Sequence, residues 1–226
     1  MIRGALIGSR FEKCTLDGYV VNRHNADAED ACRRVASGEI DGVFLFGPPG
    51  VGKTHLLVGI AKAFIEKRMP AEAESEVVKL PSLRELLESQ DYADDAEAPV
   101  SLSPLEQAHE PLVEFWPMLD LVSELRAEIK AGELELSRRC RTCDLLVIDD
   151  LGAERATDFV QEELLRILDW RYRDRQPMAV ATNLTDREIT ERYGWATLSR
   201  WAEFGELVKI EDSDYRLGKP KARART

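Results

Sequence analysis

A glycine-rich segment near residue 50 has the residue types and spacing of a loop that binds phosphate groups. It fits the pattern G-x-x-x-x-G-K-[ST] and consists of Gly47, Pro48, Pro49, Gly50, Val51, Gly52, Lys53 and Thr54. The glycines allow backbone N–H groups to turn toward phosphate oxygens, where the N-terminus of a following helix adds partial positive charge. We expect Lys53 to reach the β- and γ-phosphates of a nucleotide and the Thr54 hydroxyl to ligate Mg²⁺.

Two carboxylates, Asp149 and Asp150, end an apolar segment in the arrangement of a Walker B motif. Because the ends of parallel strands converge on the ligand crevice of a sheet, we expect both side chains near the phosphate loop. Asp149 is expected to hold the Mg²⁺ shell, and Asp150 to orient or deprotonate an attacking water. The alternative interpretation is an acidic loop that merely follows a strand.

A third polar group, Asn183, comes directly after the apolar residues 178–181 and Thr182. An amide at the tip of a neighbouring strand is placed to hold the attacking water or to sense the γ-phosphate. The competing interpretation is a simple turn residue.

Apolar segments that precede these groups predict the strands of the sheet that positions them. Such short continuous apolar runs are typical of buried parallel strands, and they occur at residues 43–46, 77–80, 145–148, 178–181 and 207–210. Helices are predicted at residues 26–36, from the phosphate loop to about 68, and at 82–87, 118–136, 157–172 and 198–204, with a further capping box at 185–188. The alternation predicts an α/β fold with a five-stranded parallel sheet flanked by helices.

Three segments fall outside this alternation. Residues 1–40 precede the first core strand. Residues 91–117 contain four prolines and many acids but no Lys or Arg, which predicts a flexible acidic insertion, although Phe115 and Trp116 are unusual for disorder. The basic tail at 217–226 is either a solvated terminus or a contact to nucleic acid.

The overall composition indicates a globular chain. It has 226 residues, of which 44% are hydrophobic and 32% charged, and no apolar run approaches the roughly 20 residues of a membrane helix. The N-terminus shows no clear signal-peptide cleavage site, so we expect a cytoplasmic protein. A net charge of −11 argues against coating duplex DNA by bulk electrostatics. Arg138, Arg139 and Arg141 form either a local basic surface or an ordinary solvated face.

The four cysteines include the pair Cys140 and Cys143 in a C-x-x-C arrangement. A structural zinc site needs a second close pair, and Cys14 and Cys32 lie far apart in the sequence. We therefore expect reduced cysteines with a structural role, with a redox or metal role of Cys140 and Cys143 left open.

The order of these motifs resembles AAA+ ATPases, and among them the DnaC-type bacterial helicase loaders and IstB-type transposition ATPases. Residues 47–56 resemble their P-loop, residues 148–154 their Walker B segment and residues 181–184 their sensor 1. Residues 198–201 match the place of the family's arginine finger, and residues 214–216 resemble its sensor 2 segment. The resemblance runs from about Phe11 to Arg216.

The resemblance implies ATP and Mg²⁺ as cofactors and ATP hydrolysis as the activity. It implies that His55 and Arg216 contact the nucleotide and that Arg200 is an arginine finger facing a neighbouring subunit of a nucleotide-dependent homo-oligomer. It also implies an N-linker at residues 1–40 and an AAA+ domain at 41–226 with a reduced C-terminal lid. The chain departs from the family in three ways. Walker B ends in Asp-Asp where many AAA+ enzymes have Asp-Glu, the loaders' N-terminal helicase-binding domain is not seen, and the insertion at 91–117 has no family counterpart.

Three functions share these motifs. The leading interpretation is a loader of a replicative helicase that acts in DNA replication and contacts single-stranded DNA. The alternative is a transposition helper ATPase that binds DNA and recruits a transposase. The third is a nucleotide-gated adaptor with little turnover, which the intact Lys53, Asp149 and Arg200 disfavour.

Overall fold

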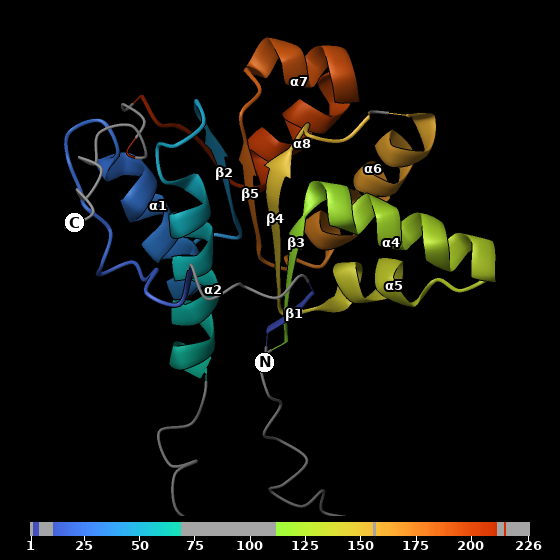
Figure 1. Ribbon diagram of the computed structural model, residues 1–226, viewed down its shortest axis with the longest axis horizontal. Coiled ribbons are helices and arrows are strands. Elements are labelled where there is room, and N and C mark those ends of the chain that lie inside the picture. Colours follow the sequence, from blue (N-terminus) through green and yellow to red (C-terminus); the bar gives the residue numbers. More distant parts are fainter. Residues whose placement is uncertain (1, 5–10, 69–111, 156, 212–214, 216–226) are drawn as a thin grey trace, which may run out of the picture. The chain divides into compact units, whose positions relative to one another are not determined.

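The computed structural model describes residues 2–4, 11–68, 112–155, 157–211 and 215 (Figure 1). Within these residues, no helix combines the length and apolarity needed to cross a membrane. The predicted strand at 77–80 and helix at 82–87 lie outside the described residues, as do most of the predicted acidic insertion and the basic tail.

The described residues form a six-stranded sheet in which all paired strands run parallel, in the order β1-β3-β4-β5-β2-β6. The strands are β1 (Ile2–Gly4), β2 (Gly42–Phe46), β3 (Val113–Pro117), β4 (Leu145–Leu151), β5 (Met178–Thr182) and β6 (Glu206–Lys209). Phe46 of β2 lies opposite Thr182 of β5, so the loops after these two strands begin side by side. The register between β4 and β5 shifts between Ile148 and Leu151, which is where the two Walker B carboxylates lie.

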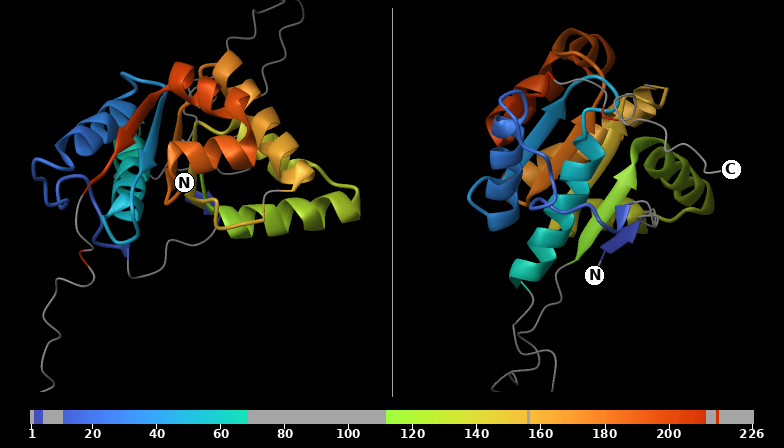
Figure 2. Two further views of the ribbon diagram at one scale, coloured as in Figure 1. Left: turned by 90° about the horizontal axis from the view of Figure 1, so that it is seen from above. Right: turned by 60° about the vertical axis from the view of Figure 1, so that its left-hand side comes forward.

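Helices cover both faces of the sheet (Figures 1 and 2). One face carries α1 (Ala26–Ser37) and α2 (Lys53–Arg68). The other carries α4 (Met118–Ala131), α5 (Glu135–Thr142), α6 (Asp158–Arg173), α7 (Asp186–Tyr193) and α8 (Trp195–Phe204). This arrangement confirms the predicted α/β fold with a parallel sheet between helical layers.

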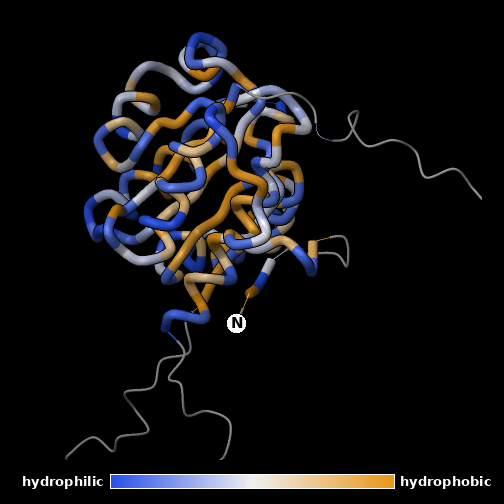
Figure 3. Tube along the Cα trace, turned by 90° about the vertical axis from the view of Figure 1, so that its left-hand side faces the viewer, coloured by the Kyte–Doolittle hydropathy of each residue, from blue (hydrophilic) through white to orange (hydrophobic). Residues whose placement is uncertain are grey.

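Alternate residues of the central strands supply the two cores. In β2, Phe44 packs among the helices α4 to α8, while Val43 and Leu45 pack against α1 and α2. The ring of Phe44 stacks on Trp201 of α8, with 4.7 Å between the ring centroids. The hydrophobic residues accordingly gather along the strands, between more hydrophilic outer segments (Figure 3). Because both faces are buried, the strands have continuous apolar sequences.

Several local predictions are confirmed. Helix α1 ends at Gly38, whose left-handed φ of 77° closes the helix as its sequence indicated. Helix α2 ends at Arg68, as expected from Pro70. The capping box of α7 forms, with Thr185 accepting a hydrogen bond from the backbone N–H of Glu188 and the Glu188 side chain bonding back.

The last part of the predicted flexible insertion is instead a buried strand. In β3, Phe115 and Trp116 pack into opposite cores. Glu114 is fully buried, and its carboxylate accepts hydrogen bonds from Arg139 Nε at 3.0 Å and Trp116 Nε1 at 2.8 Å. These two partners compensate the buried charge, which explains how an acidic residue lies in an inner strand.

Two further element predictions are wrong. The single helix expected at 118–136 is two helices, because Gly132 adopts a left-handed φ of 77° and ends α4. The described sheet has six strands. Four of them were predicted, and β3 and the three-residue β1 were not; the fifth predicted strand, at 77–80, lies outside the described residues. Residues 2–4, assigned to the N-linker, therefore pair with β3 at the edge of the sheet.

Candidate active site

The phosphate loop connects the end of β2 to the start of α2, as the motif requires. Gly52 has a φ of 97°, and the ring of Tyr19 lies where its side chain would be, 2.8 Å from the position of an added Cβ. The Tyr19 hydroxyl donates a hydrogen bond to the carbonyl of Val51 at 3.2 Å. Only glycine suits both the conformation and the close approach of this ring, so Tyr19 and Gly52 together support the loop.

The ammonium group of Lys53 points across the loop. It donates hydrogen bonds to the carbonyls of Gly47 at 2.7 Å and Pro48 at 2.8 Å, and to Asn183 Oδ1 at 2.8 Å. Lys53 is only 5% exposed, so these three oxygens compensate a largely buried charge. The phosphate-binding role expected for this lysine stays a prediction, and it requires phosphate oxygens to take the place of these acceptors.

The hydroxyl of Thr54 donates a hydrogen bond to Asp149 Oδ2 at 2.8 Å. Asp149 is 6% exposed, and this burial raises the pKa of its carboxyl group, although the hydrogen bond from Thr54 acts in the opposite direction. A hydroxyl beside a carboxylate provides the hard oxygen ligands that Mg²⁺ prefers. Among the described residues, no cluster of three or more His, Cys, Asp or Glu could hold a metal ion.

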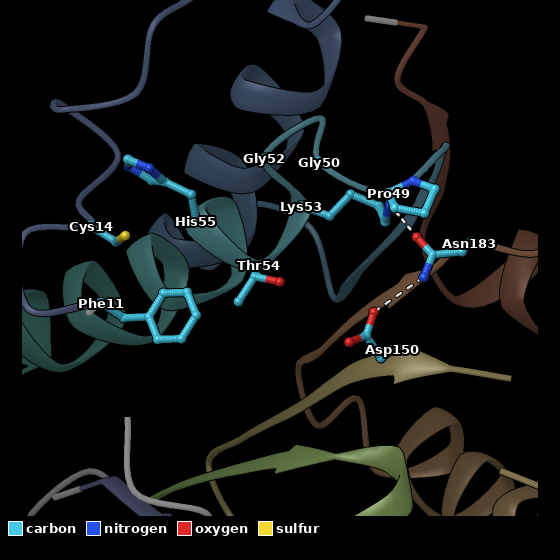
Figure 4. Close-up of a pocket in the computed structure, with 10 residues that line it drawn as sticks. All are labelled: Phe11, Cys14, Pro49, Gly50, Gly52, Lys53, Thr54, His55, Asp150 and Asn183. Carbon is cyan, nitrogen blue, oxygen red and sulfur yellow. Dashed lines mark hydrogen bonds between the residues drawn. The ribbon is translucent and has the colours of Figure 1, made fainter. Parts of the chain in front are cut away.

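Asp150 occupies the irregular end of β4 and has a left-handed φ of 52°. This conformation turns its exposed side chain toward β5, where Asn183 Nδ2 donates a hydrogen bond to Asp150 Oδ1 at 3.2 Å. Asn183 therefore bridges Lys53 and Asp150 (Figure 4). The three groups that were expected to act on the γ-phosphate and the attacking water lie within one chain of hydrogen bonds.

These groups line a cavity of about 310 Å³. Its lining consists of Phe11, Cys14, Pro49, Gly50, Gly52, Lys53, Thr54, His55, Asp150 and Asn183 (Figure 4). Phe11 and Cys14 were not predicted as site residues. They carry no motif of their own and reach the site because residues 11–19 contact α2 and the phosphate loop. Lys62 holds this segment by donating to the carbonyls of Phe11 and Glu12 at 3.2 and 2.5 Å.

His55, which was expected to contact the nucleotide, lines the cavity and also contacts the N-terminal segment. Its Nε2 lies 2.9 Å from the carbonyl oxygen of Thr15, and its ring makes an edge contact with Tyr19. His55 therefore joins α2 to the segment that closes one side of the cavity.

Of the two predicted arginines, the structure describes only Arg200, which is not among the residues that line this cavity. Arg200 lies on α8 and forms an ion pair with Asp169 of α6, with 2.6 Å between Arg200 Nε and Asp169 Oδ1. Arg216 lies outside the described residues. The backbone N–H of Tyr215, the residue before it, donates to the carbonyl of Gly50 at 3.1 Å, so the chain reaches the phosphate loop at this point.

The cysteine pair and the arginine cluster do not contribute to the cavity. Cys140 and Cys143 are buried free thiols, and burial raises the pKa of both. Of the clustered arginines, Arg138 pairs with Glu135 and Arg139 with Glu114, while Arg141 lies near the ring of Trp170. These contacts give each residue a structural partner.

Comparison with known sequences finds one family model and several distant relatives. The family model of the bacterial DnaA ATPase domain matches residues 11–80. The uncharacterized protein YqaM of Bacillus subtilis (strain 168) is 25% identical over 154 residues, which cover 66% of this chain and 36% of YqaM. The initiator DnaA of Campylobacter jejuni is 25% identical over 160 residues, which cover 68% of this chain and 27% of DnaA. The chain thus spans only about a third of these two relatives.

Solved structures show the same fold over most of the chain. The crystal structure of the DnaC helicase loader matches with a TM-score of 0.65 and 22% identity, covering 90% of this chain and 99% of that one. The initiator DnaA bound to AMPPCP and single-stranded DNA matches with a TM-score of 0.64 and 20% identity, covering 89% of this chain and 51% of that one. DnaI matches with a TM-score of 0.63 and 16% identity, covering 94% of this chain and 96% of that one. The expected resemblance to DnaC-type AAA+ proteins is confirmed at the level of the fold.

Proposed function

We propose that this chain, which has the AAA+ fold shared by the DnaC helicase loader and the DnaA initiator, binds Mg²⁺-ATP and hydrolyses it to ADP and phosphate. One observation carries the proposal. Lys53 and Thr54 of α2, Asp149 and Asp150 of β4, and Asn183 after β5 meet through hydrogen bonds of 2.8–3.2 Å beside one cavity. This is the set of groups that phosphoryl transfer from a nucleotide to water requires.

Each side chain has a separate task in this reaction. Backbone N–H groups of the loop and the Lys53 ammonium bind the phosphate oxygens, for which Lys53 exchanges its contacts to Gly47 and Pro48. Asn183 orients the water, and Asp150 accepts its proton as the bond to the γ-phosphorus forms and the bond to ADP breaks. Thr54 and Asp149 would hold a Mg²⁺ ion, which would supply charge neutralisation for phosphoryl transfer.

The biological role that we propose is the loading of a replicative helicase during DNA replication, in the cytoplasm. Support comes from the described fold, which matches a helicase loader over 99% of that chain, and from the DnaA match at residues 11–80. The matched proteins whose names state a role are the DnaC helicase loader and the replication initiator DnaA, so we favour a helicase over a transposase as partner.

A basic groove is our candidate for the contact to single-stranded DNA. It has a volume of about 570 Å³ and is lined by Leu119, Val122, Ser123, Arg126, Ala127, Lys130, Glu154 and Arg155. Arg126, Lys130 and Arg155 are exposed there, whereas the carboxylate of Glu154 is buried and bonded to Tyr193 and Gly152. A positively charged groove that follows a phosphate backbone is the common way to bind single strands.

The functional assembly that we propose is a nucleotide-dependent homo-oligomer. Arg200 of one subunit would face the γ-phosphate in its neighbour, because its position on α8 does not reach the cavity of its own chain. An arginine supplied in this way contributes about 10³–10⁵ to the rate of phosphoryl transfer in other enzymes.

The proposed function is tested by measuring ATP turnover with and without single-stranded DNA, and by co-purification with a hexameric replicative helicase from the same host. We expect turnover that depends on Mg²⁺ and changes with DNA, and a complex with the helicase that depends on nucleotide. Arg126→Ala with Lys130→Ala should weaken DNA binding, whereas the control Arg138→Ala, which is paired with Glu135 outside the groove, should not. Absence of Mg²⁺-dependent ATP turnover would disprove the proposal that this chain hydrolyses ATP.

A further inference from the structure

We propose that Glu154 is a positioning residue for hydrolysis, and that together with Tyr193 it holds the turn that presents Asp150 to the attacking water. The inference rests on the proposed function, because it concerns how the expected base is held. Glu154 is not among the described residues that line the candidate nucleotide cavity, and its described hydrogen bonds go to Gly152 and Tyr193.

The turn that carries Asp150 is closed by two hydrogen bonds. The N–H of Ala153 donates to the carbonyl of Asp150 at 3.0 Å, and the N–H of Gly152 donates to Glu154 Oε2 at 3.0 Å. Both Asp150 and Gly152 have left-handed φ values, 52° and 94°. Left-handed backbone is uncommon outside glycine, although Asp adopts it more readily than most residues, so the bonds that close this turn help to hold the direction of the Asp150 carboxylate.

The carboxylate of Glu154 is in turn held by α7. Glu154 is 5% exposed, and its Oε1 accepts a hydrogen bond from the hydroxyl of Tyr193, which is itself 6% exposed. Burial and the neighbouring carboxylate raise the pKa of the Tyr193 phenol, which keeps it protonated as a donor. A buried carboxylate is costly unless it is hydrogen bonded, and the bonds described for Glu154 go to the turn and to α7.

Two further contacts attach the same turn to its surroundings. Arg192 Nη1 donates to the carbonyl of Gly152 at 2.7 Å, and the side chain of Leu184 lies 2.3 Å from where a Cβ on Gly152 would be. Gly152 is therefore bonded through its N–H and its carbonyl and is packed from the side. The end of α7 thus holds the turn after Asp150 through neighbouring residues, Arg192 and Tyr193.

This arrangement also links Asp150 to the helix that carries Arg200. Gly194 separates α7 from α8, and Thr197 of α8 donates from its hydroxyl to the carbonyl of Tyr193 at 2.8 Å. A displacement of Tyr193 would therefore affect both the turn and the start of α8. Glu154 and Tyr193 therefore hold Asp150, the expected base, and α8, which carries the expected arginine finger, in fixed positions relative to each other.

The test compares Glu154→Ala, Glu154→Gln and Tyr193→Phe in the full chain. We expect Glu154→Ala to lower kcat by at least about tenfold, since small displacements of a reacting group reduce rates strongly, while the Kd for ATP stays within about twofold. Glu154→Gln should recover most of the loss, because its amide oxygen still accepts from Gly152. The kcat of Tyr193→Phe should lie between those of Glu154→Ala and Glu154→Gln. Turnover is expressed per ATP-binding site, which removes any effect of unfolded protein.

Glu163→Ala is the matched control, because Glu163 is also a buried carboxylate with a hydroxyl partner, Ser137, but lies in α6 away from the cavity. It should lower the melting temperature and leave kcat per site unchanged. A wild-type kcat in Glu154→Ala, or an equal loss in Glu163→Ala, would overturn the inference.

Amide hydrogen exchange at Gly152 and Ala153 provides a readout that does not depend on turnover. Exchange should become faster in Glu154→Ala and remain slow in Glu154→Gln, and equal exchange in all variants would overturn the inference. Absence of turnover in the wild-type protein would disprove the proposed function instead, so the two failures are distinguishable.

Discussion

The hydroxyl of Thr54 lies 2.8 Å from Asp149 Oδ2, although 95 positions separate the two residues in the sequence. The contact joins the first turn of α2 directly to β4. It places the two predicted Mg²⁺ ligands at hydrogen-bonding distance from each other. The first predictions concern the residues around this contact.

Lys53→Ala should weaken ATP binding at least about tenfold, because the charge that faces the β- and γ-phosphates is removed. The fold should survive, since the Lys53 ammonium bonds to loop carbonyls and to Asn183 and is not part of either hydrophobic core. Titration with a fluorescent ATP analogue measures the change. Lys67→Ala, in the last turn of the same helix, is the control and should bind normally. Unchanged affinity in Lys53→Ala would contradict the phosphate-loop assignment.

Asp149→Asn should raise the melting temperature of the nucleotide-free protein at neutral pH by a few degrees. Because burial raises the pKa of Asp149, the folded protein binds a proton at this group more tightly than the unfolded chain does. The ionised carboxylate therefore costs stability at neutral pH, and this cost decreases as the pH falls through the raised pKa. The advantage of Asp149→Asn should shrink in the same direction.

The same variant should lose the stabilisation that Mg²⁺-ATP gives the wild-type protein. Thermal denaturation between pH 5 and 8, with and without Mg²⁺-ATP, measures both effects, using the exposed Asp158→Asn as control. A variant that Mg²⁺-ATP stabilises as strongly as the wild type would show that Asp149 is not a metal ligand.

Asp150→Asn should bind Mg²⁺-ATP and hydrolyse it at least about a hundredfold more slowly, because an amide cannot accept the proton of the attacking water. Asparagine tolerates the left-handed φ of 52° at this position, so the backbone should be preserved. Steady-state turnover and ATP affinity are measured together. Hydrolysis at the wild-type rate would place the base elsewhere.

Asn183→Ala should slow hydrolysis more than it weakens binding. The substitution removes the amide that connects Lys53 to Asp150 and leaves both groups present. We therefore expect kcat to fall about tenfold or more while the Kd for ATP changes by only a few-fold. Thr185→Ala, which removes the cap of α7 two residues later, is a control for local destabilisation. Equal losses of kcat in both variants would indicate a turn residue without a catalytic task.

Arg200→Ala should bind ATP almost normally and hydrolyse it very slowly if Arg200 acts on a neighbouring subunit. The local ion pair with Asp169 offers the competing explanation, and such half-exposed pairs contribute only about 0–1 kcal/mol. Asp169→Asn breaks the same pair and retains Arg200, so it should keep its activity.

Mixing inactive Lys53→Ala and Arg200→Ala subunits should restore part of the turnover, because some interfaces then combine an intact site with an intact finger. A mixture that co-assembles on native gels yet stays inactive would exclude the action in trans. Loss of activity in Asp169→Asn would favour a structural role for Arg200.

Local patterns in the sequence were sufficient to predict much of the framework. The phosphate loop, the end of α2 at Arg68, the left-handed Gly38 after α1 and the capping box at Thr185 all depend on residues within a few positions of one another. Four of the predicted strands were also placed correctly, because burial on both faces of a parallel sheet leaves continuous apolar runs.

Segments whose stability comes from distant partners were missed. β3 follows a proline-rich acidic segment and contains Glu114, whose charge is acceptable only beside Arg139 and Trp116. β1 is three residues long and forms because its backbone pairs with β3. In both cases the neighbouring residues in the sequence indicated an exposed segment outside the sheet, whereas partners brought near by folding make the segment a strand of the sheet.

The sequence by itself determined which residues carry the candidate chemistry, since the identities and spacing of Lys53, Thr54, Asp149, Asp150 and Asn183 are local properties of the chain. Only the tertiary structure decided how they act together. The order of the strands joins Thr54 to Asp149, the bulge in β4 aims Asp150 at Asn183, and the N-terminal segment brings Phe11 and Tyr19 to the loop. The role of Glu154 depends on α7, about forty residues later. Hydrogen bonds and packing between distant segments depend on the register and burial of whole elements, which local patterns do not specify.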